Sequence, residues 1–206
     1  MRPTLALTFL ALGLLLPMGA ARAANLTGCT ADQVPLVQAA YDEAEARTRA
    51  GLEHLAREPD GDLARRWFGT APRAEVRTVL KQVLAGLRPG KRPPTGCGTA
   101  RTCRDGGIFA FARLDERRIT VCPRFFNSDA SMGRDTRFGT LVHEVSHLVA
   151  KTKDAAYGPG AAMQLAAQRP RVAMRNADNV EYFVEGAPMP PLRKPLVRAK
   201  GLTGAH

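Results

Sequence analysis

The sequence Thr140-Leu-Val-His143-Glu144-Val-Ser-His147-Leu-Val-Ala150 contains two histidines four positions apart, with a glutamate directly after the first. Because residues four apart on a helix share one face, His143 and His147 can bind one metal ion, with Glu144 beside them. The opposite side of this helix is apolar and consists of Leu141, Val142, Val145, Leu148 and Val149. The pattern therefore predicts an amphipathic helix with a metal site on its polar face.

The H-E-x-x-H spacing also predicts a reaction. Two neutral imidazoles hold Zn²⁺, and a carboxylate that is not a ligand takes a proton from the bound water. A chance match is uncommon in a chain with four histidines. We therefore expect a zinc hydrolase whose general base is Glu144.

The first 23 residues have the pattern of a secretory signal peptide. Arg2 precedes an apolar run from Leu5 to Leu16, and Ala21-Arg22-Ala23 suits a cleavage site. The run is too short for a comfortable membrane span, and no later stretch reaches that length. The sequence predicts an exported protein, secreted or periplasmic, without a membrane span.

The composition is basic, with a formal charge of +11 that falls to +9 when the signal peptide and its two arginines are removed. The densest positive clusters lie in residues 88–92 and in the Pro-rich, basic segment 188–206. Aromatic residues do not alternate with these charges, as a surface that stacks bases requires. Nucleic-acid binding is therefore not expected.

Cysteine usage agrees with export. The even number of cysteines predicts two disulfides, although four cysteines allow three connectivities. They are Cys29, Cys97, Cys103 and Cys122. No C-x-x-C pair is present, which argues against a cysteine-rich zinc site.

Helical periodicity dominates the first half of the chain. Residues 30–55 and 76–87 carry apolar stripes, and residues 63–68 form a short helical segment with Trp67, which we expect in the core. His54 is surrounded by charged residues and is expected at the surface. Asp135 is a plausible N-cap of the metal-binding helix.

Two short β-rich runs, residues 107–113 and 118–122, are separated by a charged turn and predict an antiparallel pair of strands. Cys103 and Cys122 flank this pair and could link it. The fold class predicted is α+β: a zincin-like, helix-rich single domain over residues 24–187, with a small antiparallel sheet and the H-E-x-x-H helix.

A catalytic zinc ion normally takes three protein ligands. Asp154 lies in a turn-forming segment just beyond the helix and is close enough to fold back to the ion. Glu181 is the alternative, since a distant helical glutamate is another common arrangement. His54 and His206 are too distant along the chain to be expected.

Three segments together resemble a known family. They are H-E-V-S-H at 143–147, T-K-D-A-A-Y-G at 152–158 and N-A-D-N-V-E-Y-F at 176–183. They are similar to the deuterolysin-type metallopeptidases, or aspzincins, and most of all to the peptidyl-Lys metalloendopeptidases. The resemblance is strong over residues 138–185.

The resemblance implies a role for each site residue. His143, His147 and Asp154 would hold one zinc ion per chain, Glu144 would be the general base, and the Tyr157 hydroxyl would stabilise the oxyanion. Asp178 and Glu181 would bind a substrate lysine at position P1′. The family's cysteine order pairs Cys29 with Cys97 and Cys103 with Cys122.

Two departures from the family pattern bear on activity. Asp154 follows His147 by only seven positions, and Ala150-Lys-Thr152 replaces the Gly-Gly-Thr or Gly-Thr approach of the family, which shortens the turn. The mature length leaves no room for a long propeptide, so export alone or a separate inhibitor would control the activity. We expect a monomeric enzyme that acts on proteins or peptides. The alternative is a secreted zincin-fold binding or inhibitory protein with little catalysis.

Overall fold

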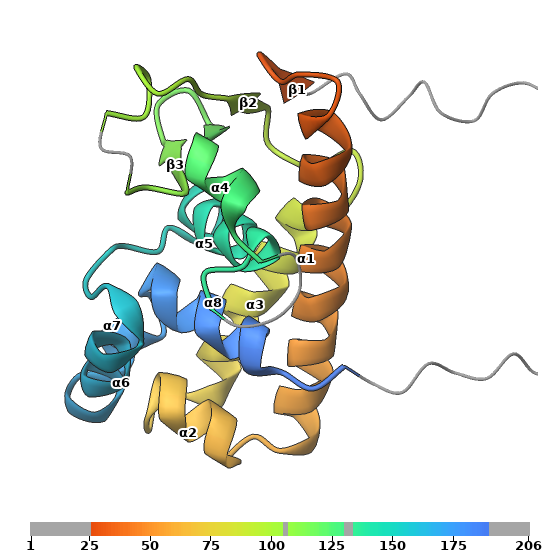
Figure 1. The fold of residues 1–206 in the computed structure, drawn as a ribbon. Helices are drawn as coiled ribbons and strands as arrows, with labels where there is room; N and C mark the ends of the chain where they lie inside the picture. The colour runs from red at the N-terminus through yellow and green to blue at the C-terminus, as the bar shows by residue number, and fades with distance from the viewer. Residues whose placement is uncertain (1–25, 105–106, 130–133, 190–206) are drawn as a thin grey trace, which may run out of the picture.

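The computed structural model describes residues 26–104, 107–129 and 134–189 (Figure 1). The predicted signal peptide and nearly all of the predicted tail lie outside these ranges. The elements in chain order are β1 (Leu26–Thr27), α1 (Gln33–Arg57), α2 (Asp62–Phe68), α3 (Arg73–Leu87), β2 (Thr95–Cys97), β3 (Ala110–Arg113), β4 (Arg118–Val121), α4 (Pro123–Asn127), α5 (Arg137–Ala150), α6 (Gly158–Gln168), α7 (Pro170–Ala173) and α8 (Ala177–Gly186). Within the described ranges, no helix combines the length and the hydropathy needed to cross a membrane.

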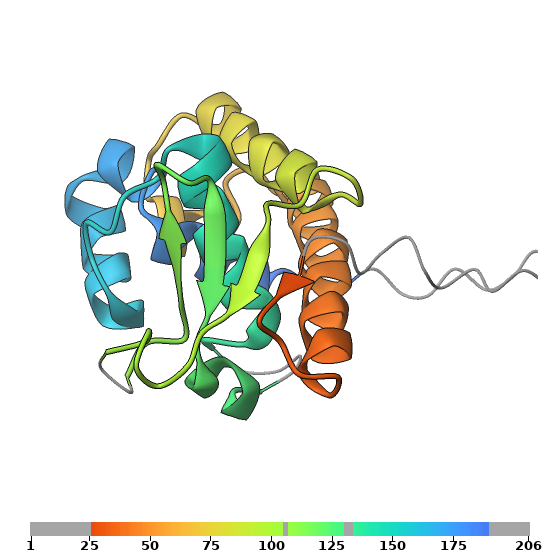
Figure 2. The same cartoon turned by 90° about the horizontal axis from the view of Figure 1, so that it is seen from above.

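Helix α5 is the predicted metal-binding helix and lies at the centre of the molecule. It packs against α1, α3 and α8, and the sheet covers it on the side seen in Figure 2. Leu141, Val142 and Val145 are fully buried on its apolar side. The face of α5 that carries His143 and His147 therefore points away from this apolar core, toward α8 and β3.

The N-cap of α5 is Thr136, not Asp135 as predicted. The backbone N–H of Gly139 donates to Oγ1 of Thr136 at 2.9 Å. Asp135 has a φ of 52°, in the left-handed region, so its backbone turns the chain before the helix begins. Oδ1 of Asp135 accepts a hydrogen bond from the Tyr182 hydroxyl at 3.2 Å instead of capping the helix.

The sheet is mixed, whereas an antiparallel sheet was predicted. The expected hairpin is present, with Ala112 paired to Ile119 across β3 and β4. Among the described residues, the strand order is β1-β2-β4-β3, and both β1–β2 and β2–β4 are parallel. The strands β1 and β2 are too short to show a β pattern in the sequence, so only their pairing reveals them. Helices and strands together confirm the α+β class.

Helix α8 is fixed against α2 by aromatic packing and by one buried amide. Trp67 is 5% exposed, as predicted for a core residue, and its ring lies 5.1 Å from that of Tyr182. Nδ2 of Asn179 donates to the carbonyl oxygens of Trp67 at 2.6 Å and Ala162 at 2.9 Å. These contacts hold the helix that carries Asp178 and Glu181.

The expectation of a surface position for His54 was wrong, since this side chain is only 7% exposed. His54 follows the buried Gly51 by three residues and precedes the buried Leu55, so it widens the apolar stripe of α1. Its charged neighbours Glu53 and Arg57 are exposed, and Oε1 of Glu58 lies 4.0 Å from Nδ1 of His54.

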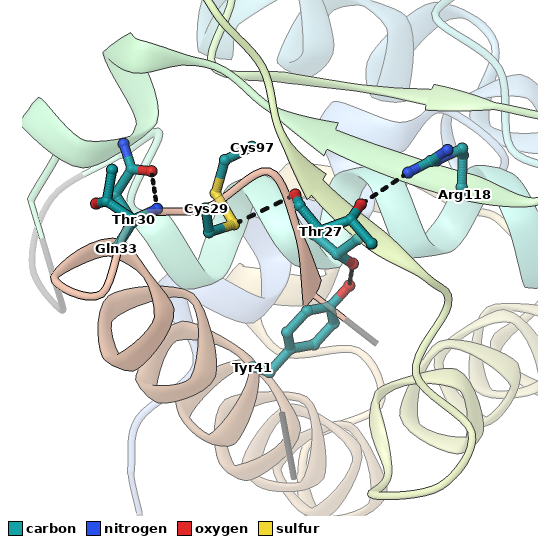
Figure 3. Close-up of a disulfide and its surroundings, with 8 residues drawn as sticks. Thr27, Cys29, Thr30, Gln33, Tyr41, Cys97 and Arg118 are labelled. Carbon is teal, nitrogen blue, oxygen red and sulfur yellow. Dashed lines mark hydrogen bonds between the residues drawn. A yellow bond between two sulfur atoms is a disulfide. The ribbon is translucent and has the colours of Figure 1, made fainter. Parts of the chain in front are cut away.

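Two disulfides tie the loops to the sheet, with the pairing that the family resemblance implied. Cys29 is bonded to Cys97 at the end of β2 (Figure 3). Cys103 is bonded to Cys122, directly after β4. Beside the first disulfide, Nη2 of Arg118 donates to Oγ1 of Thr27 at 3.0 Å, which links β4 to β1.

Candidate metal centre and active site

The two histidines of α5 share one acceptor. Oδ1 of Asp154 lies 3.2 Å from Nε2 of His143 and 3.2 Å from Nε2 of His147. The imidazole rings are nearly perpendicular, with centroids 4.9 Å apart. Three donor atoms from two segments of the chain therefore converge on one point.

The short turn after α5 delivers Asp154 to this point. Lys151 ends the helix in the left-handed conformation, with φ at 56°. The N–H of Lys153 then donates to the carbonyl of Arg175 at 2.8 Å, and Oδ1 of Asn176 accepts the N–H of Ala155 at 2.7 Å. These two hydrogen bonds flank Asp154 and hold it in place.

The donor set fits zinc. Ligand atoms about 2.0–2.1 Å from one tetrahedral zinc ion lie about 3.3 Å from each other. Both distances from Asp154 Oδ1 to the imidazole Nε2 atoms match this spacing. Two imidazoles and one carboxylate are also a ligand set that catalytic zinc sites use.

The other nitrogen of each imidazole is hydrogen bonded. Nδ1 of His143 lies 3.1 Å from Oε2 of Glu181 and 3.0 Å from Oδ1 of Asp178. Nδ1 of His147 lies 3.0 Å from the carbonyl oxygen of Thr152. These partners accept hydrogen bonds, so they favour a proton on each Nδ1 and leave each Nε2 lone pair for a metal.

The charges of the site also favour a cation. Burial by itself would lower the pKa of His143, but hydrogen bonds to Asp154, Asp178 and Glu181 outweigh it and raise this pKa. Burial would raise the pKa of Asp154, but the imidazoles of His143 and His147 lower it. A group of carboxylates around two imidazoles is an environment that a divalent ion would neutralise.

Glu144 lies beside the histidines and is only 6% exposed. Burial raises the pKa of its carboxyl group, while His143 and His147 oppose the shift. The backbone N–H of Ala112, on β3, hydrogen bonds to it. A positioned carboxylate with a raised pKa suits a general base that works near neutral pH.

Tyr157 lies at the mouth of the site and is 68% exposed. Partial burial and then the negative charge of Asp154 raise the pKa of its hydroxyl group. The phenol therefore keeps its proton at neutral pH and can donate it in a hydrogen bond. The side chain lines the same cavity as His143 and Glu144.

This cavity has a volume of about 300 Å³ and extends from β3 to α8. Asp178 and Glu181 line it, as a pocket for a basic side chain requires, but both also contact Nδ1 of His143. Glu181 thus lies at the opposite ring nitrogen from the one that faces Asp154. This arrangement favours Asp154 over Glu181 as the third ligand.

Several residues of the site were not found from the sequence. Thr152 orients His147, Asn176 anchors the turn of Asp154, and Ala112 donates to Glu144. Asn176 lies in a segment already noted for its family resemblance, which was a usable signal. Ala112 acts through a backbone N–H, which no side-chain pattern reveals. Thr152 contacts Nδ1 of His147 through both its carbonyl oxygen and its hydroxyl, at 3.0 and 3.2 Å.

Comparison with known proteins places this geometry in a family. Residues 54–185 match the aspzincin M35 model, described as lysine-specific metallo-endopeptidase. The chain is 32% identical over 170 residues to a peptidyl-Lys metalloendopeptidase of Pleurotus ostreatus, covering 80% of this chain and 98% of the relative. It is also 32% identical to an extracellular protease of Aeromonas hydrophila over 84% of this chain, but spans only 50% of that relative.

A solved structure has the same fold. The zinc peptidase from Grifola frondosa superposes with a TM-score of 0.67 at 28% identity, covering 76% of this chain and 96% of that one. The family model covers the H-E-x-x-H helix, the turn of Asp154 and nearly all of α8. The chain therefore belongs to the aspzincin M35 family and is a zinc metalloendopeptidase.

Proposed function

We propose that the chain is an exported endopeptidase that binds one zinc ion and cleaves peptide bonds on the amino side of lysine. His143, His147 and Asp154 would hold the ion. The observation that carries the proposal is the single oxygen of Asp154 at 3.2 Å from both Nε2 atoms. The two disulfides and the name of the Aeromonas relative support export.

Zinc bound there would act as a Lewis acid and lower the pKa of a coordinated water. Glu144 takes the proton from the attacking water and passes it to the leaving amine. The N–H of Ala112 keeps the carboxylate in place during this transfer. The hydroxyl of Tyr157 donates a hydrogen bond to the oxyanion that forms at the scissile carbonyl.

The preference for lysine rests on the acidic wall of the cavity. Asp178 and Glu181 are 5% and 4% exposed, so their charges act in a poorly solvated pocket. An ammonium group that enters this pocket gains more from them than it would at an open surface. The names of relatives such as the Pleurotus enzyme support the same preference.

Digestion of a denatured, lysine-containing protein tests the proposal. The mature chain, with zinc, is compared with Glu144→Gln, and cut sites are read by mass spectrometry. We expect cuts before lysine that disappear in Glu144→Gln and with a chelator, and return with added zinc. A folded, zinc-loaded wild type that makes no cuts would instead support the binding or inhibitory protein.

A further inference from the structure

The cavity beside His143 holds more carboxylates than the expected lysine pocket uses. Asp135 lines it together with Glu144, Asp178 and Glu181. Asp135 lies on the loop before α5 and is half-buried. Neither the zinc chemistry nor the family resemblance gives this residue a role.

The two expected pocket residues have most of their oxygens engaged. Oδ1 of Asp178 and Oε2 of Glu181 both contact Nδ1 of His143. Oδ2 of Asp178 accepts the backbone N–H of Gly158 at 2.6 Å. Of the four oxygens, only Oε1 of Glu181 has no donor from the described part of the chain, whereas a lysine ammonium brings three donors.

Asp135 offers a second such oxygen. The hydroxyl of Tyr182 donates to Oδ1 of Asp135 at 3.2 Å, and Oδ2 has no donor from the described residues. Burial, and then the charges of Asp178, Glu181 and Asp135, raises the pKa of Tyr182, so its hydroxyl remains a donor. Tyr182 follows Glu181 on α8 and also lines the cavity, so it holds Asp135 beside the pocket.

We propose that Asp135 is a specificity-determining residue whose carboxylate, held by Tyr182, completes with Glu181 the site for a lysine ammonium group at P1′. The assignment rests on the proposed cleavage before lysine. An ammonium between the two carboxylates would offset their repulsion and use the oxygens that no other donor engages.

The test uses two peptides that differ only at P1′, one with lysine and one with norleucine, which has a neutral side chain. Asp135→Asn, Tyr182→Phe and wild type are assayed with zinc bound, and Asp115→Asn in the exposed β3–β4 turn is the control. Asparagine tolerates the left-handed conformation at position 135, so this variant preserves the backbone.

For Asp135→Asn we expect kcat/KM to fall about 10- to 100-fold for the lysine peptide and to change little for the norleucine peptide. Tyr182→Phe should lower kcat/KM for the lysine peptide relative to the norleucine peptide by a smaller factor, with zinc content unchanged. If Asp135→Asn keeps the wild-type ratio, or slows both peptides equally, the role of Asp135 is refuted. A wild type that does not prefer lysine would refute the lysine pocket itself, and Asp135 with it.

Discussion

Oδ1 of Asp178 lies 3.0 Å from Nδ1 of His143, so a carboxylate of the proposed lysine pocket also contacts an imidazole of the proposed zinc site directly. If both proposed roles hold, the zinc affinity and the preference for lysine are coupled through the side chain of Asp178. Partners of this kind raise the basicity of the imidazole and fix its orientation.

The first prediction follows from this contact. Asp178→Asn should weaken zinc binding about 10- to 100-fold, because the imidazole loses an anionic partner. It should also lower the preference for lysine. Zinc competition with a fluorescent chelator measures the first effect, and the lysine and norleucine peptides measure the second. Unchanged zinc affinity would show that Glu181 alone orients His143.

Asn176 is fully buried and anchors the turn that carries Asp154. Its Oδ1 accepts the N–H groups of Ala155 and Ala156, and its Nδ2 donates to the carbonyl of Ala156. Asn176→Ala should reduce the zinc content of the purified protein and cost about 2–4 kcal/mol of stability. Metal analysis and thermal unfolding measure these effects. Full zinc loading in a destabilised variant would show that the turn holds Asp154 without this amide.

Glu185 gives a pH dependence of stability. Thr136 donates its N–H and its hydroxyl to Oε1 of Glu185, while Oε2 is buried without a partner in the described structure. Burial, and then the charge of Glu181, raises the pKa of Glu185 from 4.5 to about 8. The folded state therefore keeps a proton that the unfolded state releases above pH 4.5.

The resulting stabilisation is complete below about pH 4.5 and is lost as the pH rises through 8. Between pH 5 and 8.5, wild type should lose about 4 kcal/mol that Glu185→Gln does not lose. Unfolding in denaturant, with saturating zinc at each pH, gives the difference between the two proteins. If the free energy of unfolding changes with pH in the same way for wild type and Glu185→Gln, Glu185 is already ionised in the folded protein.

Self-digestion provides another prediction. Only six of the 30 basic residues are lysine, and four of these lie in the described structure. Lys81 is inside α3, Lys91 closes a turn by donating to Arg88, and the N–H groups of Lys151 and Lys153 are hydrogen bonded. A peptidase requires its substrate in an extended conformation. The peptide bonds before these four lysines are therefore not accessible to cleavage in the folded protein.

The folded enzyme should therefore keep residues 26–189 intact during overnight incubation, while a denatured, catalytically inactive Glu144→Gln chain is cut by wild type before each lysine. Intact-mass measurement decides between the two outcomes. Cuts before Lys194 or Lys200 would leave the described structure whole, whereas cuts before Lys81 or Lys153 in the folded protein would contradict the prediction.

The sequence by itself determined the local chemistry. A period of 3.6 residues places His143, Glu144 and His147 on one face of α5 whatever the rest of the chain does. The core position of Trp67, in the short helical segment 63–68, was also predicted and is confirmed. These features depend on residues within one or two helical turns of each other, and such short spacings are fixed by backbone geometry.

Only the tertiary structure decided which segments meet. Asp178 and Glu181 contact His143 because α8 packs across α5, and Ala112 reaches Glu144 because β3 lies at the edge of the sheet. The burial of His54 and the parallel pairing of β2 with β4 were missed for the same reason. Packing depends on the shapes of surfaces brought together from distant parts of the chain, and no local period records those shapes.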